Sequence, residues 1–224
     1  MHAKRISIVI PALNEAKNIG HVITGVKKIL DGRSYEIIVV DGHSKDRTAS
    51  IAKRMGAKVI YDNVGKGSAL IKGLHAAKGD ILVSMDADLS TDPKELGLLI
   101  GGIEVGYDVC MGSRFMAGGS SEDISYIRKL GNRFFVYLVN IIFGANYSDM
   151  CNGYRSFRKD VLNKLSLHET GFGIETEISI NAVKRDLKVL EVPSVEKKRV
   201  AGEGKLRTFR DGYAILRTII KNLG

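Results

Sequence analysis

Short apolar runs alternate with longer segments of helical periodicity along the first half of the chain. In the longer segments apolar residues recur three and four positions apart, which is typical of helices with one buried face; they are residues 15–30, 46–55, 65–77 and 93–103. The short runs end at Pro, Gly or Asp and are typical of buried strands; they are residues 6–10, 35–40, 58–61, 80–85 and 109–111. This alternation predicts an α/β fold with a mostly parallel sheet and helices on both faces.

The pattern changes after Phe115 and becomes mainly helical. Three segments predict loops because they are rich in Gly or in polar residues: 116–121, 148–158 and 200–205. Helical spacing returns in three segments: 124–143, 174–184 and 209–223. One further strand is expected at residues 187–192. We interpret residues 1–224 as one domain, with a helical C-terminal extension to the sheet.

Composition and charge narrow the class of protein. Hydrophobic residues make up 44% of the 224 residues, which is enough for a sizeable core. The formal net charge of +9 favours an anionic partner, whether nucleic acid, an anionic lipid surface or a phosphate-bearing substrate. Two cysteines do not make a disulfide framework, so a reducing, cytoplasmic setting is expected. Neither a secretory signal nor a run of about 20 apolar residues is seen, so we expect a soluble or peripheral protein.

Polar residues follow four of the predicted strands at the point where each strand ends. These segments are residues 11–15, 41–46, 86–88 and 112–115. Ligands of parallel sheets bind beyond the carboxyl ends of the strands. We therefore expect the four segments to converge on one edge of the sheet and to form the ligand site.

Two of the polar motifs suit a phosphate-bearing ligand. Asp86-Ala87-Asp88 places two carboxylates around a small residue at a strand end, and carboxylate oxygens are ligands for Mg²⁺ or Mn²⁺. A D-x-D triplet alone is common by chance, but its place after a buried run favours a functional role. Gly65-Lys66-Gly67 precedes a helix, where backbone amides and a lysine suit a phosphate, although a plain pair of turn glycines is the alternative.

Seven segments together resemble the family-2 glycosyltransferases of the GT-A, Rossmann-like fold. They are similar to dolichyl-phosphate mannose synthase and related polyprenyl-phosphate glycosyltransferases. In chain order they are PALNE (11–15), VVDGHSKDRT (39–48), GKGSAL (65–70), DADLS (86–90), GSRF (112–115), DMCNGYR (149–155) and R-VAG-EGK (199–205). The resemblance therefore extends over nearly the whole chain.

The resemblance implies a role for each matching position. The nucleotide of the donor would be bound by Pro11, Leu13, Glu15, Asp41, Lys66, Asp86 and Ala87. Asp86 and Asp88 would hold Mg²⁺ or Mn²⁺, and with Arg114 they would form the catalytic set. Phosphate and acceptor contacts would come from Arg114, Asp149, Arg155, Arg199 and Lys205. Residues 1–115 would then be the nucleotide-sugar half and residues 116–224 the acceptor half.

Two positions depart from the pattern of the family. The second strand ends in Asp41-Gly42-His43-Ser44, where Asp-Asp-Gly-Ser is frequent. Ser90 stands where the mannose synthases commonly have Gln. The departures leave open the nucleoside contacts at this strand end, the third metal ligand and the identity of the sugar.

The implied reaction is an inverting transfer of a hexose from a GDP- or UDP-sugar to a polyprenyl (dolichyl) phosphate. A phosphate acceptor is already anionic, whereas a glycan or small-molecule hydroxyl, the alternative acceptor, needs a general base. Asp149, Glu175 and Glu177 are the candidates for that base.

Two other classes fit less well. A sugar-nucleotide pyrophosphorylase would carry a Gly-rich loop with an Arg in place of residues 11–15. A nucleic-acid-binding module would interleave aromatic residues with basic ones, but aromatic residues are only 7% and the predicted sheet edge is acidic. Nucleic acid is therefore not an expected partner.

Two basic amphipathic segments bear on membrane association. Residues 128–143 begin with basic residues and carry a wide apolar face, and the last predicted helix is also basic. Such helices either lie in an anionic membrane interface or pack their apolar face on the core. The lipid-phosphate acceptor favours the former, which predicts a peripheral protein on the cytoplasmic face of the membrane.

Overall fold

The computed structural model describes residues 4–198 and 208–223. Arg199 and Lys205, both predicted to contact phosphates, lie outside the described residues. Of the described helices, none has the length and apolar character needed to cross a bilayer.

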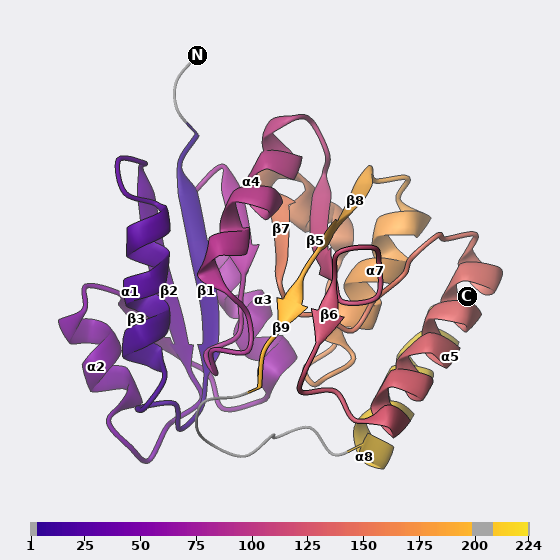
Figure 1. Ribbon diagram of the computed structural model, residues 1–224, viewed down its shortest axis with the longest axis horizontal. Coiled ribbons are helices and arrows are strands. Elements are labelled where there is room, and N and C mark those ends of the chain that lie inside the picture. Colours follow the sequence, from indigo (N-terminus) through magenta and orange to yellow (C-terminus); the bar gives the residue numbers. More distant parts are fainter. Residues whose placement is uncertain (1–3, 199–207, 224) are drawn as a thin grey trace.

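A seven-stranded sheet forms the centre of the molecule, in the order β3-β2-β1-β4-β7-β5-β8 (Figure 1). Its strands are β1 (Ile6–Ala12), β2 (Tyr35–Asp41), β3 (Lys58–Tyr61), β4 (Ile81–Ser84), β5 (Val109–Ser113), β7 (Arg155–Arg158) and β8 (Val189–Pro193). Neighbouring strands run parallel except at β7, which is antiparallel to both β4 and β5. The predicted mostly parallel sheet is confirmed.

Helices cover both faces of the sheet because successive side chains of a strand point to opposite faces. Ile6, Ile8 and Ile10 of β1 pack with α1 (Ile19–Ile29) and α4 (Leu96–Glu104), while Val9 packs on the other face. That second face is covered by α3 (Lys66–Ala76), α6 (Leu162–Leu165) and α7 (Ile174–Lys184). The remaining helical elements are α2 (Thr48–Arg54), α5 (Tyr126–Phe143), α8 (Thr208–Lys221) and the short 3-10 turns η1 (Pro93–Glu95) and η2 (Lys159–Val161).

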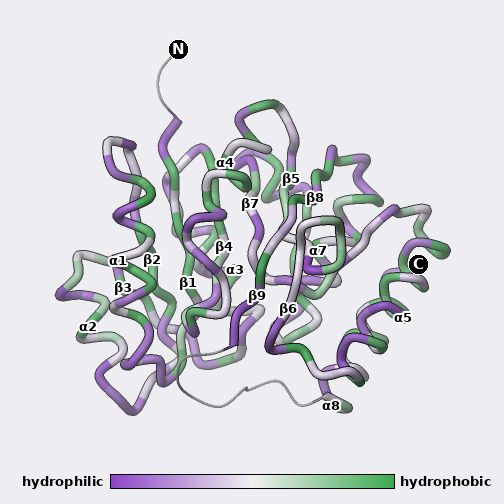
Figure 2. Tube along the Cα trace, viewed as in Figure 1, coloured by the Kyte–Doolittle hydropathy of each residue, from purple (hydrophilic) through white to green (hydrophobic). Residues whose placement is uncertain are grey.

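The prediction of a loop over residues 148–158 is wrong at its end, because β7 occupies Arg155–Arg158. Only Phe157 of this strand is apolar, so the strand gives no hydrophobic signal, and in Figure 2 β7 is mostly purple where β1 and β2 are mostly green. Two of its polar side chains are nevertheless buried: Ser156 donates to the Leu99 carbonyl and Arg155 has three acceptors. Hydrogen bonds to groups elsewhere in the chain therefore stabilise this central strand, in place of the apolar contacts that are usual there.

Several predicted boundaries also move. The first helix begins at Ile19 rather than at residue 15, because residues 15–18 form turns in which the Glu15 and Ala16 amides donate to Thr48 and Asp46. The predicted loop 116–121 ends in β6 (Ser120–Ser121), which pairs with β9 (Val195–Glu196) in a small second sheet.

Candidate functional site

The loops that leave β1 and β2 lie side by side at the carboxyl edge of the sheet. The register pairs Ala12 with Asp41, and the Gly42 amide donates to the Ala12 carbonyl. Asn14 then joins the two loops: its amide donates to Ser44 Oγ at 2.8 Å, and its side-chain oxygen accepts from the Lys45 amide at 2.8 Å. The structure thus brings these two predicted segments together.

Backbone strain is concentrated at the same edge. Asn14, His43 and Leu89 have φ angles of 53°, 59° and 64°, and they follow β1, β2 and β4 in turn. A left-handed conformation is unfavourable for a residue with a side chain, most of all for a bulky one such as Leu89. Such conformations are typical of functional sites, where the surrounding structure holds them in place.

Asp41 lies at the base of this edge with only 1% of its surface exposed. Its Oδ2 accepts from the Ser44 amide at 2.9 Å, whereas its Oδ1 is buried and has no hydrogen-bond partner. A buried carboxylate oxygen without a donor costs free energy, so a ligand that brings an N–H or O–H group would bind favourably there.

The other residues predicted for the nucleoside pocket lie at the end of β1 and in the loop after it, and β1 pairs with β2 beside Asp41. Leu13 is 38% exposed, and it lies so close to Gly42 that a Cβ there would be 3.3 Å from Leu13 Cδ1. Pro11 is part of β1, and Glu15 accepts a hydrogen bond from Asn18. His43 packs its ring against Tyr61, with centroids 5.5 Å apart. The sequence departure at residue 43 therefore adds an aromatic contact to Tyr61, the residue that pairs with Asp41.

The Asp86-Ala87-Asp88 triplet directly follows β4. Ala87 is 4% exposed and packs in the apolar core, and this contact anchors the triplet at the edge of the sheet. The Asp86 side chain is 30% exposed, and Asp88 Oδ1 accepts from the Ser90 amide at 3.0 Å. Two carboxylates here fit Mg²⁺ or Mn²⁺, which often binds through one or two carboxylates plus substrate phosphates. Within residues 4–198 and 208–223 no group of three or more His, Cys, Asp or Glu residues could hold a metal.

Lys66 is an ion-pair partner of Asp86. Its Nζ lies 3.0 Å from Asp86 Oδ1 and 3.0 Å from Glu175 Oε1. Burial alone would lower the pKa of Lys66, but the charges of the two carboxylates outweigh burial and raise it, so the ammonium stays protonated. The neighbouring Ser68 amide donates to the Thr170 carbonyl. At this helix end the Ser68 amide is therefore already paired, and the Lys66 side chain stays the predicted phosphate contact.

Arg114, the predicted phosphate contact after β5, is 9% exposed and held by two carboxylates. It binds Asp149 in a bidentate manner, with Nε and Nη2 at 2.7 and 3.1 Å, and its Nη1 lies 3.2 Å from Glu196. Burial alone would lower the pKa of Arg114, but Asp149 and Glu196 raise it. Asn132 of α5 donates to Asp149 at 3.2 Å, and the Asn132 Oδ1 is buried without a partner.

Arg155 lies beneath the loop that joins α5 to β7. It is 1% exposed and donates to the carbonyls of Met150 and Asn152 and to Ser179 Oγ. These contacts hold the loop from below. All three donor groups of Arg155 are thus used inside the protein, and its predicted acceptor contact stays a prediction.

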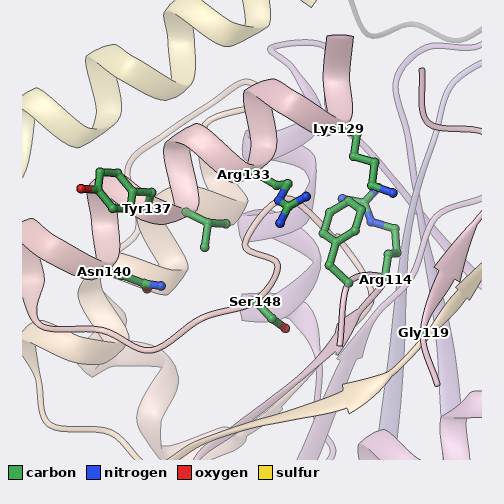
Figure 3. A pocket seen from close by; sticks show the side chains of 9 residues that line it. Arg114, Gly119, Lys129, Arg133, Tyr137, Asn140 and Ser148 are labelled. Atoms are coloured by element: carbon green, nitrogen blue, oxygen red, sulfur yellow. The ribbon is translucent and has the colours of Figure 1, made fainter. Parts of the chain in front are cut away.

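A pocket of about 560 Å³ lies between α5 and the segment that follows β5 (Figure 3). The side chains of Lys129 and Arg133 project into it from α5, toward the segment with Arg114. The Lys129 ammonium also lies 5.9 Å from the ring centre of Phe115. The pocket is lined by Arg114, Phe115, Gly119, Lys129, Arg133, Val136, Tyr137, Asn140 and Ser148. Sequence reasoning placed Lys129 and Arg133 only on a basic helix; their spacing of four, continued by Tyr137, was the available signal.

Comparison with known proteins gives consistent matches over the chain. The profile of the family described as "Glycosyl transferase family 2" matches residues 7–166. A dolichol-phosphate mannosyltransferase of Pyrococcus furiosus is 36% identical over 91% of the chain. A dolichyl-phosphate hexose transferase of Haloferax volcanii is 34% identical over 96% of it. The chain spans 59% of the length of the Pyrococcus protein and 92% of that of the Haloferax protein.

Among solved structures, glucosyl-3-phosphoglycerate synthase from Mycobacterium tuberculosis, in complex with Mn²⁺, UDP and glucosyl-3-phosphoglycerate, superposes with a TM-score of 0.78. It is 25% identical, and the alignment covers 99% of this chain and 80% of the mycobacterial one.

Proposed function

Since the chain belongs to glycosyl transferase family 2, we propose that it transfers a hexose from a nucleotide-diphosphate sugar to a polyprenyl phosphate, with inversion of the anomeric centre. The fold is the GT-A, Rossmann-like type of the family, and the chain is a glycosyltransferase. One observation carries the proposal: the carboxylates of Asp86 and Asp88 follow β4 at the same sheet edge as the unpaired Asp41 oxygen. That edge suits both ends of a nucleoside diphosphate.

The donor would bind in the half formed by residues 1–115. The buried Asp41 Oδ1 would accept from an N–H of the base or a hydroxyl of the ribose, beside Pro11, Leu13 and Glu15. Asp86 and Asp88 would hold Mg²⁺ or Mn²⁺. A divalent cation bound there stabilises the negative charge that builds on the leaving diphosphate. The Mn²⁺ and UDP of the mycobacterial synthase support the use of a metal. Lys66 would place its ammonium next to the same charge, from its position on Asp86.

The state of the candidate bases supports an acceptor that is already anionic. Asp149 is fully buried and paired with Arg114, and Glu175 is paired with Lys66. Glu177 Oε2 accepts from the amides of His168 and Glu169, both at 2.8 Å. All three carboxylates thus have structural partners. A hydroxyl nucleophile would need one of them to take its proton, whereas a phosphate oxygen attacks as an anion.

The pocket below α5 supports the same acceptor. Lys129 and Arg133 bring positive charge to it, and Tyr137 and Phe134 expose apolar surface on α5 next to them. An anionic head with an apolar chain complements this combination. The names of the Pyrococcus and Haloferax relatives, which refer to dolichol and dolichyl phosphate, agree with a lipid phosphate. We assign the acceptor to the half formed by residues 116–224.

The exposed faces of α5 and α8 support membrane association. The helices lie side by side (Figure 1), and Gly212 of α8 faces the ring of Phe135 of α5. Asn132, Val136 and Val139 turn one side of α5 to the core. Another side exposes large apolar residues at helical spacing: Ile127, Leu130, Phe134, Tyr137 and Ile141. On α8 the exposed set is Phe209, Tyr213 and Ile220, with Arg210, Arg217 and Lys221 nearby. We propose that these faces rest on the anionic, cytoplasmic surface of a membrane.

A screen of donors against acceptors tests the proposal. The protein is incubated with GDP- and UDP-sugars, Mg²⁺ or Mn²⁺, and either a short polyprenyl phosphate or the matching polyprenol. We expect a sugar-phosphoprenol by mass spectrometry for at least one donor, and no product with the alcohol. A product formed only with a hydroxyl acceptor would instead establish the alternative function, transfer to a glycan or small-molecule hydroxyl.

A further inference from the structure

Three charged side chains from distant parts of the chain meet at the carboxyl edge of the sheet. Lys66 is the first residue of α3, Asp86 follows β4, and Glu175 lies in the first turn of α7. The Lys66 Nζ bridges the two carboxylates, 3.0 Å from each. The side chain of Glu175 is 6% exposed and that of Asp86 is 30% exposed. The ammonium is thus shared between an inner carboxylate and an outer one, and the outer one is a proposed metal ligand.

Close backbone packing fixes the position of the lysine. A Cβ added at Gly65 or Gly67 would lie 2.4 or 2.2 Å from the carbonyl oxygens of Thr170 or Glu169, so only glycine fits on either side of Lys66. A Cβ added at Gly153 would lie 3.2 Å from the Lys66 Nζ. These contacts fix the backbone from which the Lys66 side chain reaches Asp86.

The position of Lys66 has a consequence for metal binding. An ammonium in contact with Asp86 repels a dication approaching the same carboxylate, and it occupies one of the oxygens that the cation would use. The inner carboxylate, Glu175, draws the ammonium toward the interior and weakens that competition. A diphosphate, which is strongly negative, offers Lys66 another partner and offers the cation additional oxygen ligands.

We propose that Lys66 is a tethered cation that competes with the divalent metal for Asp86, and that Glu175 sets the strength of this competition. The proposal rests on the metal site of the proposed function and deepens it. It makes metal binding and nucleotide binding cooperative: the metal binds weakly to the protein alone and tightly together with a nucleoside diphosphate. By linkage the nucleotide gains the same factor from the metal.

The test measures Mn²⁺ binding from the EPR signal of the free ion, first with Mn²⁺ alone and then with UDP or GDP present. The informative variant is Lys66→Met/Glu175→Gln, which removes the pair without changing the net charge. Lys66 contacts Asp86 directly, whereas Glu175 is the inner carboxylate. Removing the positive charge of Lys66 should therefore affect Mn²⁺ binding more than removing the negative charge of Glu175. We expect this variant to bind Mn²⁺ alone at least about tenfold more tightly than the wild type, and to gain less from the nucleotide.

Two further variants sharpen the result. In Glu175→Gln, Asp86 is the one remaining carboxylate of the pair that held the Lys66 ammonium. This variant should therefore bind Mn²⁺ without nucleotide more weakly than the wild type does. Lys72→Met/Asp62→Asn removes another Lys–Asp pair involving α3, 4.0 Å apart, and serves as the matched control. The control should bind Mn²⁺ as the wild type does.

Two results would overturn the proposal, and they can be told apart. If Lys66→Met/Glu175→Gln binds Mn²⁺ no more tightly than the control, while the wild type binds Mn²⁺ with nucleotide, the competition is refuted and the metal site stands. If neither the wild type nor any of the variants binds Mn²⁺ even with UDP or GDP, the metal site of the proposed function is refuted as well.

Discussion

At the scale of single residues, the two carboxylate oxygens of Asp41 have different surroundings. One of its carboxylate oxygens is paired with the Ser44 amide, and the other is buried without a partner. Stability alone would favour a neutral side chain in this position. We propose that a bound nucleotide supplies the missing donor to this oxygen.

We expect Asp41→Asn to weaken binding of the donor's nucleotide by about tenfold or more, because a charged hydrogen bond is lost. The melting temperature should stay the same or rise, since a buried charge is removed. Calorimetric titration with UDP and GDP measures the first effect and thermal unfolding the second. Asp80→Asn, at the opposite end of β4, is the control. Unchanged nucleotide affinity in Asp41→Asn would remove Asp41 from the pocket.

Arg155 is a buried charged residue whose guanidinium group stabilises the fold through hydrogen bonds. Its three donors satisfy Met150, Asn152 and Ser179 in the interior. We expect Arg155→Met to lower the free energy of unfolding by about 3 kcal/mol or more, as is typical when a buried polar network loses its centre. Urea unfolding measures this. Full stability combined with lost transfer would show instead that Arg155 contacts the acceptor directly.

At the scale of elements, the strands were predictable where burial on both faces makes a run of Val, Ile and Leu, as in β1, β2 and β4. The antiparallel β7 was not, because Arg155 and Ser156 are buried through hydrogen bonds rather than through apolar contacts. The triplet at Asp86 was predictable from the rule on strand ends. The partners of Arg114 were not, because Asp149 and Glu196 lie 35 and 82 positions away along the chain.

The exposed side of α5 gives a prediction for an element. Leu130 and Phe134 are 59% and 54% exposed, so replacing both with Ser should leave stability nearly unchanged. Binding to vesicles that contain anionic lipid should decrease, because apolar area is lost from the interface. Co-sedimentation with the vesicles measures this, and Val105→Ser, an exposed apolar residue after α4, is the control. Equal sedimentation of both variants and the wild type would contradict a membrane role for this face.

At the scale of the whole molecule, acidic and basic groups are separated in a way that fits the proposed reaction. Carboxylates mark the edge of the sheet at Asp41, Asp86 and Asp88, where a metal and a nucleotide are proposed to bind. Basic residues outnumber acidic ones on α5, which carries Lys129 and Arg133, and on α8. These two helices contribute part of the net charge of +9, on the side where a lipid phosphate and an anionic surface are proposed to lie.

We propose that Asp86 and Asp88 make the transfer to polyprenyl phosphate dependent on a metal. The most direct measurement is the amount of sugar-phosphoprenol formed by the wild type and by Asp88→Ala, each with Mg²⁺ or Mn²⁺ and with excess EDTA, after circular dichroism has shown that the variant is folded. We expect product only from the wild type with metal. Full activity in Asp88→Ala, or in the wild type with excess EDTA, would contradict the account.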